Sequence, residues 1–184
     1  MRLMIASDIH GSAFYCRQML NAYEREKADR LLLLGDILYH GPRNDLPREY
    51  APKEVIGMLN SGRENLLCVR GNCDTEVDQM VLKFPIMAEY CLLNLDGQTI
   101  FAAHGHNMNP DHLPMLKKGD ILLNGHTHIP ACEEREEYIY MNPGSVSIPK
   151  ENSAHSYMIY DEHLFEWKDM NGEVYNTWKT NTHC

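Results

Sequence analysis

The sequence predicts an α/β protein in which two β-sheets face each other and helices cover the outside. The first half alternates strand-like and helix-like segments, which is typical of βαβ units in a largely parallel sheet. The run LLLL at residues 31–34 is apolar throughout, as expected of a strand that is covered on both faces. The second half consists of short strand-like runs separated by turn residues, which favours hairpins in a second sheet.

The individual elements follow from the spacing of the apolar residues. Apolar runs at 2–7, 29–36 and 64–72 predict strands, and helical spacing with a charged face predicts helices at 16–28 and 51–60. Between them, residues 40–52 contain three prolines and predict a long loop. In the second half, strands are expected at 88–95, 98–104, 120–126, 137–143, 156–161 and 164–169.

Length and composition indicate one domain that spans residues 1–184 and has an ordinary buried core. No apolar stretch is long enough to span a membrane, and the first residues do not resemble a signal peptide, so we expect a cytoplasmic protein. The six cysteines lack a CxxC pair and are expected to be reduced thiols. The formal net charge of −9 argues against a generic nucleic-acid or membrane-surface binder. An anionic substrate would therefore need bound cations to reverse the local field.

Five apolar runs end in residues of the types that bind metals. In a mainly parallel sheet the carboxyl ends of the strands converge, so these side chains are expected at one rim. Each segment alone also fits a turn, a helix cap or a hydrogen-bonded histidine, but five independent turns would not each need a ligand-type residue at the same end of a strand. The candidate ligands are Asp8, His10, Asp36, Asn72, His104, His126 and His128.

The mixture of donors indicates the kind of metal site. Carboxylate, amide oxygen and imidazole without a set of thiolates are typical of open sites for manganese, iron or zinc, and differ from the cysteine-rich sites of structural zinc. Seven ligands are too many for one ion and suit two ions that share a carboxylate. Such a pair can activate water and hold a phosphate during in-line displacement.

The motifs DIH, LGD, GNCD, HGH and GHTH, in this order, resemble the signature of the calcineurin-like metallophosphoesterases. The stretches HGPRN, EVDQM and NPGSVSIPK narrow the resemblance to the small bacterial YfcE-type phosphodiesterases. The resemblance covers nearly the whole chain and weakens after about Tyr160. It implies a four-layer α/β/β/α sandwich, the metallophosphoesterase fold, with two mixed sheets flanked by helices.

The resemblance also implies how the ligands are divided. Asp8, His10 and His128 would bind one divalent ion, Asn72, His104 and His126 the other, and Asp36 would bridge them. A hydroxide between the two ions would attack the phosphorus of a small phosphodiester. Manganese is the metal expected first, and zinc, nickel and iron are alternatives.

Three further residues are candidates for contacts with the substrate. Cys73 stands where many members of the wider superfamily have a histidine that serves the leaving group, so good leaving groups are expected to be preferred. Arg43, in the proline-rich loop, is a candidate for binding a phosphate oxygen, and a solvated loop arginine is the alternative. His106 is a candidate for the substrate side of the site, with a supporting hydrogen-bonding role as the alternative.

Two other functions remain open. The fold is also that of a eukaryotic retromer subunit, so a protein-interaction scaffold with a vestigial or secondary metal site is the main alternative. A nuclease on long DNA or RNA is disfavoured by the acidic charge. A homodimer or higher homo-oligomer is expected, since dimers are common.

Overall fold

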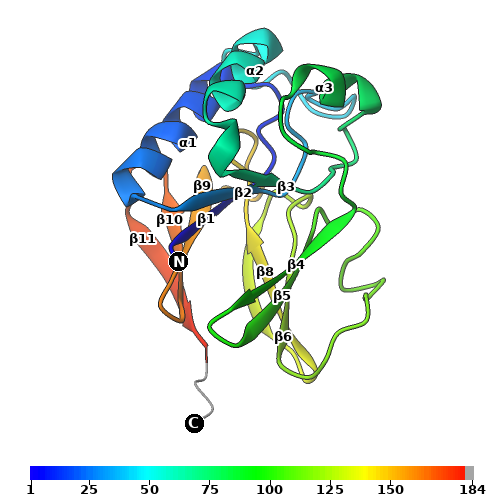
Figure 1. Cartoon of the computed structure of the whole chain (residues 1–184), viewed down its shortest axis with the longest axis vertical. Helices are drawn as coiled ribbons and strands as arrows, with labels where there is room; N and C mark the ends of the chain where they lie inside the picture. The colour runs from blue at the N-terminus through cyan, green and yellow to red at the C-terminus, as the bar shows by residue number, and fades with distance from the viewer. Residues whose placement is uncertain (181–184) are drawn as a thin grey trace.

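The structure is a computed structural model that describes residues 1–180. Two β-sheets pack face to face, and the helices lie on the outside (Figure 1). The first sheet has six strands in the order β11-β10-β9-β1-β2-β3, and the second has five in the order β4-β5-β6-β8-β7. The prediction of two facing mixed sheets flanked by helices is therefore confirmed.

The first sheet is parallel on one side and antiparallel on the other. Strands β1 and β2 and strands β2 and β3 pair in parallel, whereas the partners from β9 onward pair antiparallel. The carboxyl ends of β1, β2 and β3 therefore lie at one edge of this sheet. Its strands are β1 (Leu3–Ala6), β2 (Arg30–Leu33), β3 (Leu66–Cys68), β9 (Ser156–Asp161), β10 (Leu164–Asp169) and β11 (Val174–Lys179).

The second sheet contains a parallel centre with antiparallel edges. Strands β5, β6 and β8 run parallel, and β4 and β7 pair antiparallel at the two edges. Loops that follow the three parallel strands leave from one end of the sheet. Its strands are β4 (Tyr90–Leu95), β5 (Gln98–Ala103), β6 (Asp120–Leu123), β7 (Pro130–Glu134) and β8 (Tyr138–Pro143).

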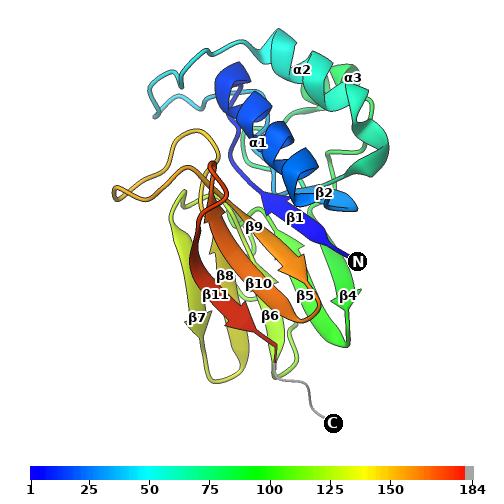
Figure 2. The same cartoon turned by 90° about the vertical axis from the view of Figure 1, so that its left-hand side faces the viewer.

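All three α-helices lie on the side of the first sheet that faces away from the second (Figure 2). They are α1 (Ala13–Glu26), α2 (Pro52–Ser61) and α3 (Glu76–Val81). The side chain of Ser12 caps α1 by accepting a hydrogen bond from the Tyr15 backbone N–H at 3.2 Å. The start of α1 is therefore fixed immediately after the first strand-end motif.

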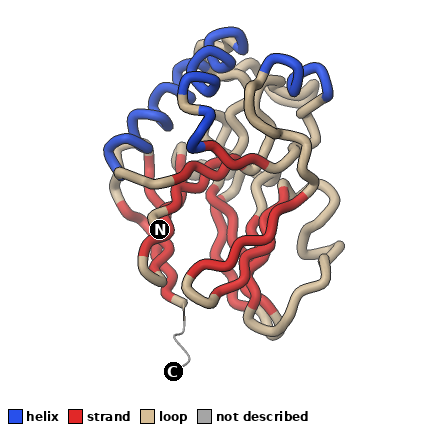
Figure 3. Tube along the Cα trace, in the orientation of Figure 1, coloured by secondary structure: helices blue, strands red, loops and turns tan. Residues whose placement is uncertain are grey.

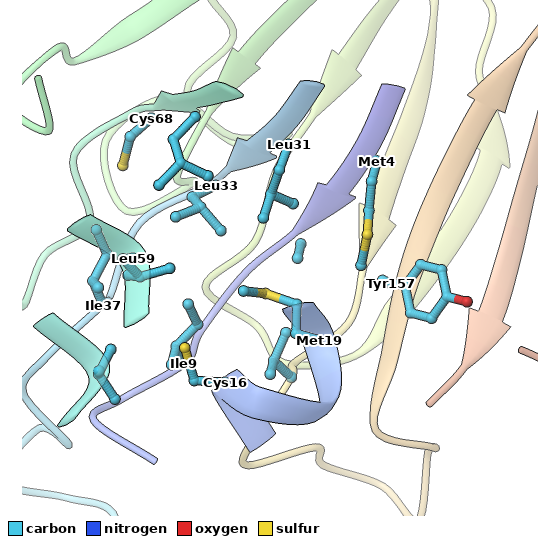
Figure 4. Close-up of a cluster of buried hydrophobic side chains, with 14 of the residues drawn as sticks. Met4, Ile9, Cys16, Met19, Leu31, Leu33, Ile37, Leu59, Cys68 and Tyr157 are labelled. Carbon is cyan, nitrogen blue, oxygen red and sulfur yellow. The ribbon is translucent and has the colours of Figure 1, made fainter. Parts of the chain in front are cut away.

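Strand β1 connects the two halves of the core because its side chains alternate between them. Met4 belongs to the cluster between the first sheet and the helices, together with residues such as Cys16 and Leu33 (Figure 4). Leu3 and Ile5 point the other way, into the cluster between the two sheets, which also contains Trp167. A strand that is apolar at every position is thus explained by burial on both faces.

The outer face of the second sheet differs from the first. In place of a layer of helices, the described chain covers this face with the irregular segment 104–119, which is drawn as a long loop in Figure 3. Met108 and Leu116 of this segment pack on Phe101, Leu122 and their neighbours. The helical layers of the expected sandwich are therefore unequal, with all regular helices on one side.

Three elements were not anticipated from the sequence. Helix α3 has six residues, none of them buried, so its sequence does not show the helical spacing of apolar residues. Strand β7 is an edge strand that begins with Pro130 and ends with two glutamates, and β11 is an edge strand whose residues are mostly exposed. Edge positions do not require the alternation by which a strand is recognised.

None of the helices within residues 1–180 has the length and apolar character of a membrane span.

The contrast between the inter-sheet core and the surface can be tested with two identical substitutions. Leu32 is fully buried between the sheets and Leu92 is 60% exposed. Leu32→Ala is expected to lower the free energy of unfolding by about 2–5 kcal/mol because it leaves a cavity. Leu92→Ala should change it by less than about 0.5 kcal/mol. Denaturant unfolding of both variants without metal is the measurement, and equal losses would contradict the assignment of the core.

Candidate metal centre

The seven candidate ligands lie together at the carboxyl ends of the parallel strands. Asp8 and His10 follow β1, and Asp36 follows β2. The remaining candidates follow β3, β5 and β6 in the same way, namely Asn72, His104, His126 and His128. The geometric expectation from the strand-end motifs is met, because the edges of both sheets contribute to one site.

The backbone is left-handed at five of these positions. The φ values are 60° for Asp8, 49° for His10, 55° for Asp36, 66° for His126 and 64° for His128. Left-handed backbone costs energy in residues other than glycine and is concentrated at functional sites. Such strain persists only where the surrounding structure enforces it. Here backbone hydrogen bonds between the loops do so, for example from His10 N–H to the Asp36 carbonyl at 2.9 Å.

One glycine makes the close approach of two of these loops possible. A Cβ atom on Gly71 would lie 2.1 Å from Oδ1 of Asp36 and 2.3 Å from its backbone nitrogen. No side chain fits there, so the loop after β3 can lie directly against the loop after β2 only with glycine at this position.

Three of the histidines have one ring nitrogen engaged by the backbone. The Nδ1 atoms of His10, His104 and His128 each lie 2.7 Å from a carbonyl oxygen, so each Nδ1 carries the proton and donates it. The acceptors are the carbonyls of Tyr39, Leu34 and Ile148, respectively. This arrangement leaves the Nε2 lone pairs free to bind a metal, as supporting hydrogen bonds do in known metal sites.

The first group of donors surrounds a point between His10, His128 and Asp8. The two Nε2 atoms are 3.3 Å apart, and Asp8 Oδ1 lies 3.5 Å from the first and 3.2 Å from the second. With both Nδ1 atoms protonated, the Nε2 lone pairs face each other. Asp8 Oδ1 is buried and accepts no hydrogen bond from the described residues. A cation between these three atoms would satisfy all of them, so the residues fit a divalent ion.

The second group lies around His104. Its Nε2 atom is 3.0 Å from Asn72 Oδ1 and 3.2 Å from His126 Nδ1. Asp36 Oδ2 is 3.5 Å from His104 Nε2 and 3.6 Å from His10 Nε2, so it lies between the two groups. The other oxygen of Asp36 accepts the Cys73 N–H at 2.8 Å, which fixes the carboxylate. These positions fit a second ion that shares Asp36, although the ligand roles themselves stay predictions.

The protonation states show how the site is balanced in the absence of ions. Burial raises the pKa of Asp8, but the imidazoles of His10 and His128 beside it hold this pKa well below its ordinary value. Burial lowers the pKa of His104, yet Asp36 and Asp8 raise it to about 9. His126 has its pKa lowered to about 4 by burial and by His104. The two carboxylates are thus charged, and the positive charge of His104 balances part of their negative charge.

A cavity of about 470 Å³ opens above this cluster. It is lined by His10, Asp36, Gly41, Pro42, Arg43, Asn44, Asn72, Cys73, His126, Thr127, His128 and Lys150. Among the described residues, every close group of three or more histidine, cysteine or acidic ligand atoms belongs to this site. A cavity of similar volume, about 460 Å³, at the amino ends of β5 and β6 has no such group.

The predicted substrate contacts are only partly brought together. Arg43 and Cys73 line the cavity, whereas His106 is not among its lining residues. The His106 ring lies 5.4 Å from that of His104 and 6.3 Å from that of His126, centroid to centroid. Its Nδ1 atom is buried and forms no hydrogen bond with the described residues, so neither of the two roles considered for it gains support.

The Cys73 thiol is half-buried beside Asp36. Burial, followed by the charge of Asp36, raises the pKa of this thiol well above its ordinary range in the metal-free protein. The thiol is therefore protonated without ions, and lowering of its pKa depends entirely on bound cations. The Cys73 hypothesis stays a prediction for the metal-loaded protein.

Sequence reasoning missed the residues that hold the loops in place. Asp74 accepts backbone N–H groups of Asp36 at 2.9 Å, Ile37 at 2.9 Å and Gly71 at 2.7 Å. Ser145 and Ser147 both donate to the Asp8 carbonyl, at 3.0 and 2.9 Å. The available signals were the acid at the end of GNCD, which reads as an ordinary turn residue, and the stretch NPGSVSIPK, which contains both serines but does not show what they contact.

Fold and site together define an α/β sandwich with candidate metal-ligand residues at converging strand ends. The chain belongs to the calcineurin-like phosphoesterase superfamily, whose domain model matches residues 1–163. It is 48% identical to the phosphodiesterase YfcE of Escherichia coli K12 over 161 residues, which cover 88% of each chain. The solved structure of YfcE, a phosphoesterase from E. coli, superimposes with a TM-score of 0.95 and 43% identity, covering 98% of this chain and all of that one.

A more distant structure shares the fold alone. Vps29 from Entamoeba histolytica, crystallised with zinc, matches with a TM-score of 0.63 at 18% identity and covers 98% of this chain and 100% of its own. This likeness shows the shared fold and does not distinguish between functions.

The supporting role of Asp74 can be tested with the isosteric change Asp74→Asn. An amide has one acceptor oxygen, so in either orientation its NH₂ group faces a backbone N–H, and about 1–3 kcal/mol of stability should be lost. Both loops should loosen, and metal affinity should fall about 10–100-fold. Thermal unfolding and metal titration are the measurements. The control is Asp78→Asn at the cap of α3, which should leave metal affinity unchanged; equal effects of the two changes would contradict the role of Asp74.

Proposed function

We propose that this protein is a dinuclear metal-dependent phosphodiesterase that hydrolyses a small phosphodiester. The observation that carries the proposal is the pair of donor groups around His10 and His104, with Asp36 Oδ2 between them. The 48% identity to a protein named as a phosphodiesterase supports the same reaction.

The chain's own residues would hold and orient the reacting groups. Asp8, His10 and His128 would hold one divalent ion, and Asn72, His104 and His126 the other, with Asp36 shared. Divalent ions at such a centre polarise the phosphoryl group and activate water. Manganese is the proposed metal, with zinc, nickel or iron as alternatives, because nitrogen and oxygen donors suit all of them.

The guanidinium group of Arg43 is free to contact a substrate. Of the nine arginines, it alone forms no hydrogen bond, ion pair or cation–π contact within residues 1–180. Arg48, in the same loop, stacks over the Phe14 ring at 3.5 Å. A guanidinium that lines the cavity and has no partner suits a phosphate oxygen.

The leaving group would depart on the side of Cys73, with good leaving groups preferred because a thiol gives little general-acid help. His106 has no assigned part.

We also propose that the protein acts in the cytoplasm as a homo-oligomer, without generic binding to nucleic acid or membranes. A scaffold function is less well supported, because all seven candidate positions carry ligand-type residues and hydrogen bonds orient four of them, His10, Asp36, His104 and His128.

The metal centre is tested by Asp36→Asn. The Asn oxygen can still accept the Cys73 N–H, while its NH₂ group faces the metals and cannot coordinate them. Wild type reconstituted with Mn²⁺ should bind two ions per chain and hydrolyse bis(4-nitrophenyl) phosphate, with activity lost on chelation and restored by Mn²⁺. The variant should lose both ions, and its kcat/KM should fall by more than about 100-fold, beyond the loss of a supporting hydrogen bond. Elemental analysis that finds one ion or none in wild type would overturn the dinuclear site.

The substrate contact is tested by comparing Arg43→Ala with Arg48→Ala. Removal of the free guanidinium should lower kcat/KM for the same diester about 10–100-fold, with metal content unchanged, because a charge-assisted contact to phosphate is lost. The Arg48 variant removes an equal charge from the same loop but only a stacking contact, so its kinetics should stay close to wild type. Steady-state kinetics of the two variants measure this. Equal losses of kcat/KM would show that Arg43 acts only through its charge and not through a contact with the substrate.

A further inference from the structure

Lys150 is the only lysine among the residues that line the cavity. It lies in the stretch that joins β8 to β9, immediately after Pro149, and its side chain is exposed. It takes part in no ion pair within residues 1–180, so its ammonium group is free to bind a ligand. With Arg43, it supplies the positive charge of the cavity wall above the metal-ligand cluster.

The backbone of Lys150 is tied directly to a candidate metal ligand. Its N–H donates to the His128 carbonyl at 3.2 Å, and the Ile148 carbonyl accepts the proton of His128 Nδ1 at 2.7 Å. The Lys150 carbonyl in turn accepts the N–H of Ser153 at 3.0 Å and its hydroxyl at 2.6 Å. The base of the lysine is therefore fixed relative to the metal cluster, while its long side chain can adjust to a ligand.

The two cations reach the cavity from different segments. Arg43 comes from the loop that contains Gly41, where an added Cβ would lie 3.4 Å from the Cys73 sulfur. Lys150 comes from the segment bonded to His128. Figure 2 shows both loops on the left-hand side of the molecule, the light-blue loop of residues 40–50 above the gold loop between β8 and β9. The loop that carries Arg43 thus lies beside Cys73, and the segment that carries Lys150 lies beside His128.

We propose that Lys150 determines specificity by binding an anionic group on the ester arm that remains attached to phosphate after hydrolysis. The inference rests on the proposed phosphodiesterase function, in which the leaving group departs beside Cys73. We place the retained arm, which stays on phosphorus, toward His128 and Lys150. A cavity of about 470 Å³ has room for such an arm beyond the phosphate itself. The substrate class is a phosphodiester whose retained arm carries a carboxylate or a second phosphate.

The test uses two diesters with the same leaving group. They are 4-nitrophenyl 2-carboxyethyl phosphate and its amide counterpart, 4-nitrophenyl 2-carbamoylethyl phosphate, which differ by one charge on the retained arm. Hydrolysis of either releases 4-nitrophenolate and leaves the arm on phosphate. The ratio of their kcat/KM values is measured on the Mn²⁺-loaded wild type and on Lys150→Met, Lys150→Glu and the control Lys117→Glu. Lys117 precedes β6 at the far end of the strands and is also exposed.

The wild type should prefer the carboxylate about fivefold, as for one solvent-accessible ion pair. Lys150→Met should bring the ratio to about one, Lys150→Glu should reverse it, and Lys117→Glu should leave it as in wild type. Calorimetric binding of the two products, 2-carboxyethyl and 2-carbamoylethyl phosphate, should show the same order without turnover.

The other outcomes separate the inference from the function on which it rests. An equal ratio in wild type and both Lys150 variants overturns the specificity role, even if all hydrolyse both diesters. An equal fall of both rates in Lys150→Met, with an unchanged ratio, would assign Lys150 to the phosphate or the leaving group instead and also overturns it. Failure of the metal-loaded wild type to hydrolyse either diester, or bis(4-nitrophenyl) phosphate, would refute the proposed function itself.

Discussion

Two buried carboxylates, Asp8 and Asp36, are the constraint on which the rest of the structure depends. Their exposed fractions are 0% and 2%, and taking a charged group out of water costs several kcal/mol even after relaxation of the protein. They persist as charged groups because imidazoles surround them and backbone N–H groups bind one oxygen of each. The other oxygen of each points to the region between the histidines. The fold thus concentrates negative charge where the candidate metal ligands converge.

Hydrogen bonds between loops hold the two carboxylates in place. Asp74 binds three backbone N–H groups from the loops after β2 and β3, and Ser145 and Ser147 bind the Asp8 carbonyl from the loop after β8. These contacts cross between loops that are far apart in sequence. Each loop is therefore held by its neighbours, which prevents the like charges from separating and keeps the donor atoms within a few ångströms of one another.

The parts of the structure that could be predicted from sequence are those with a periodic or repeated signal. The buried strands were recognisable because both faces of β1 and β2 are apolar, and the clustering of the candidate ligand residues because each follows a strand. The edge strands β7 and β11 and the short helix α3 lack a buried face and were missed. Asp74 and Lys150 were missed for a different reason. Their roles come from contacts across loops, and neither the loop paths nor the cavity wall can be derived from spacing alone.

The left-handed backbone at the ligand positions also restricts how this site can change during evolution. Asparagine, aspartate and histidine tolerate that conformation better than other side chains, whereas β-branched residues are strained in it. At Asp8, His10, Asp36, His126 and His128, the backbone alone therefore disfavours valine, isoleucine or threonine, whether or not a metal is bound. A descendant that no longer needed the ions would still tolerate only a few residue types at these positions. Parts of the motif would then persist after metal binding was lost, because the left-handed backbone and metal binding favour much the same residue types.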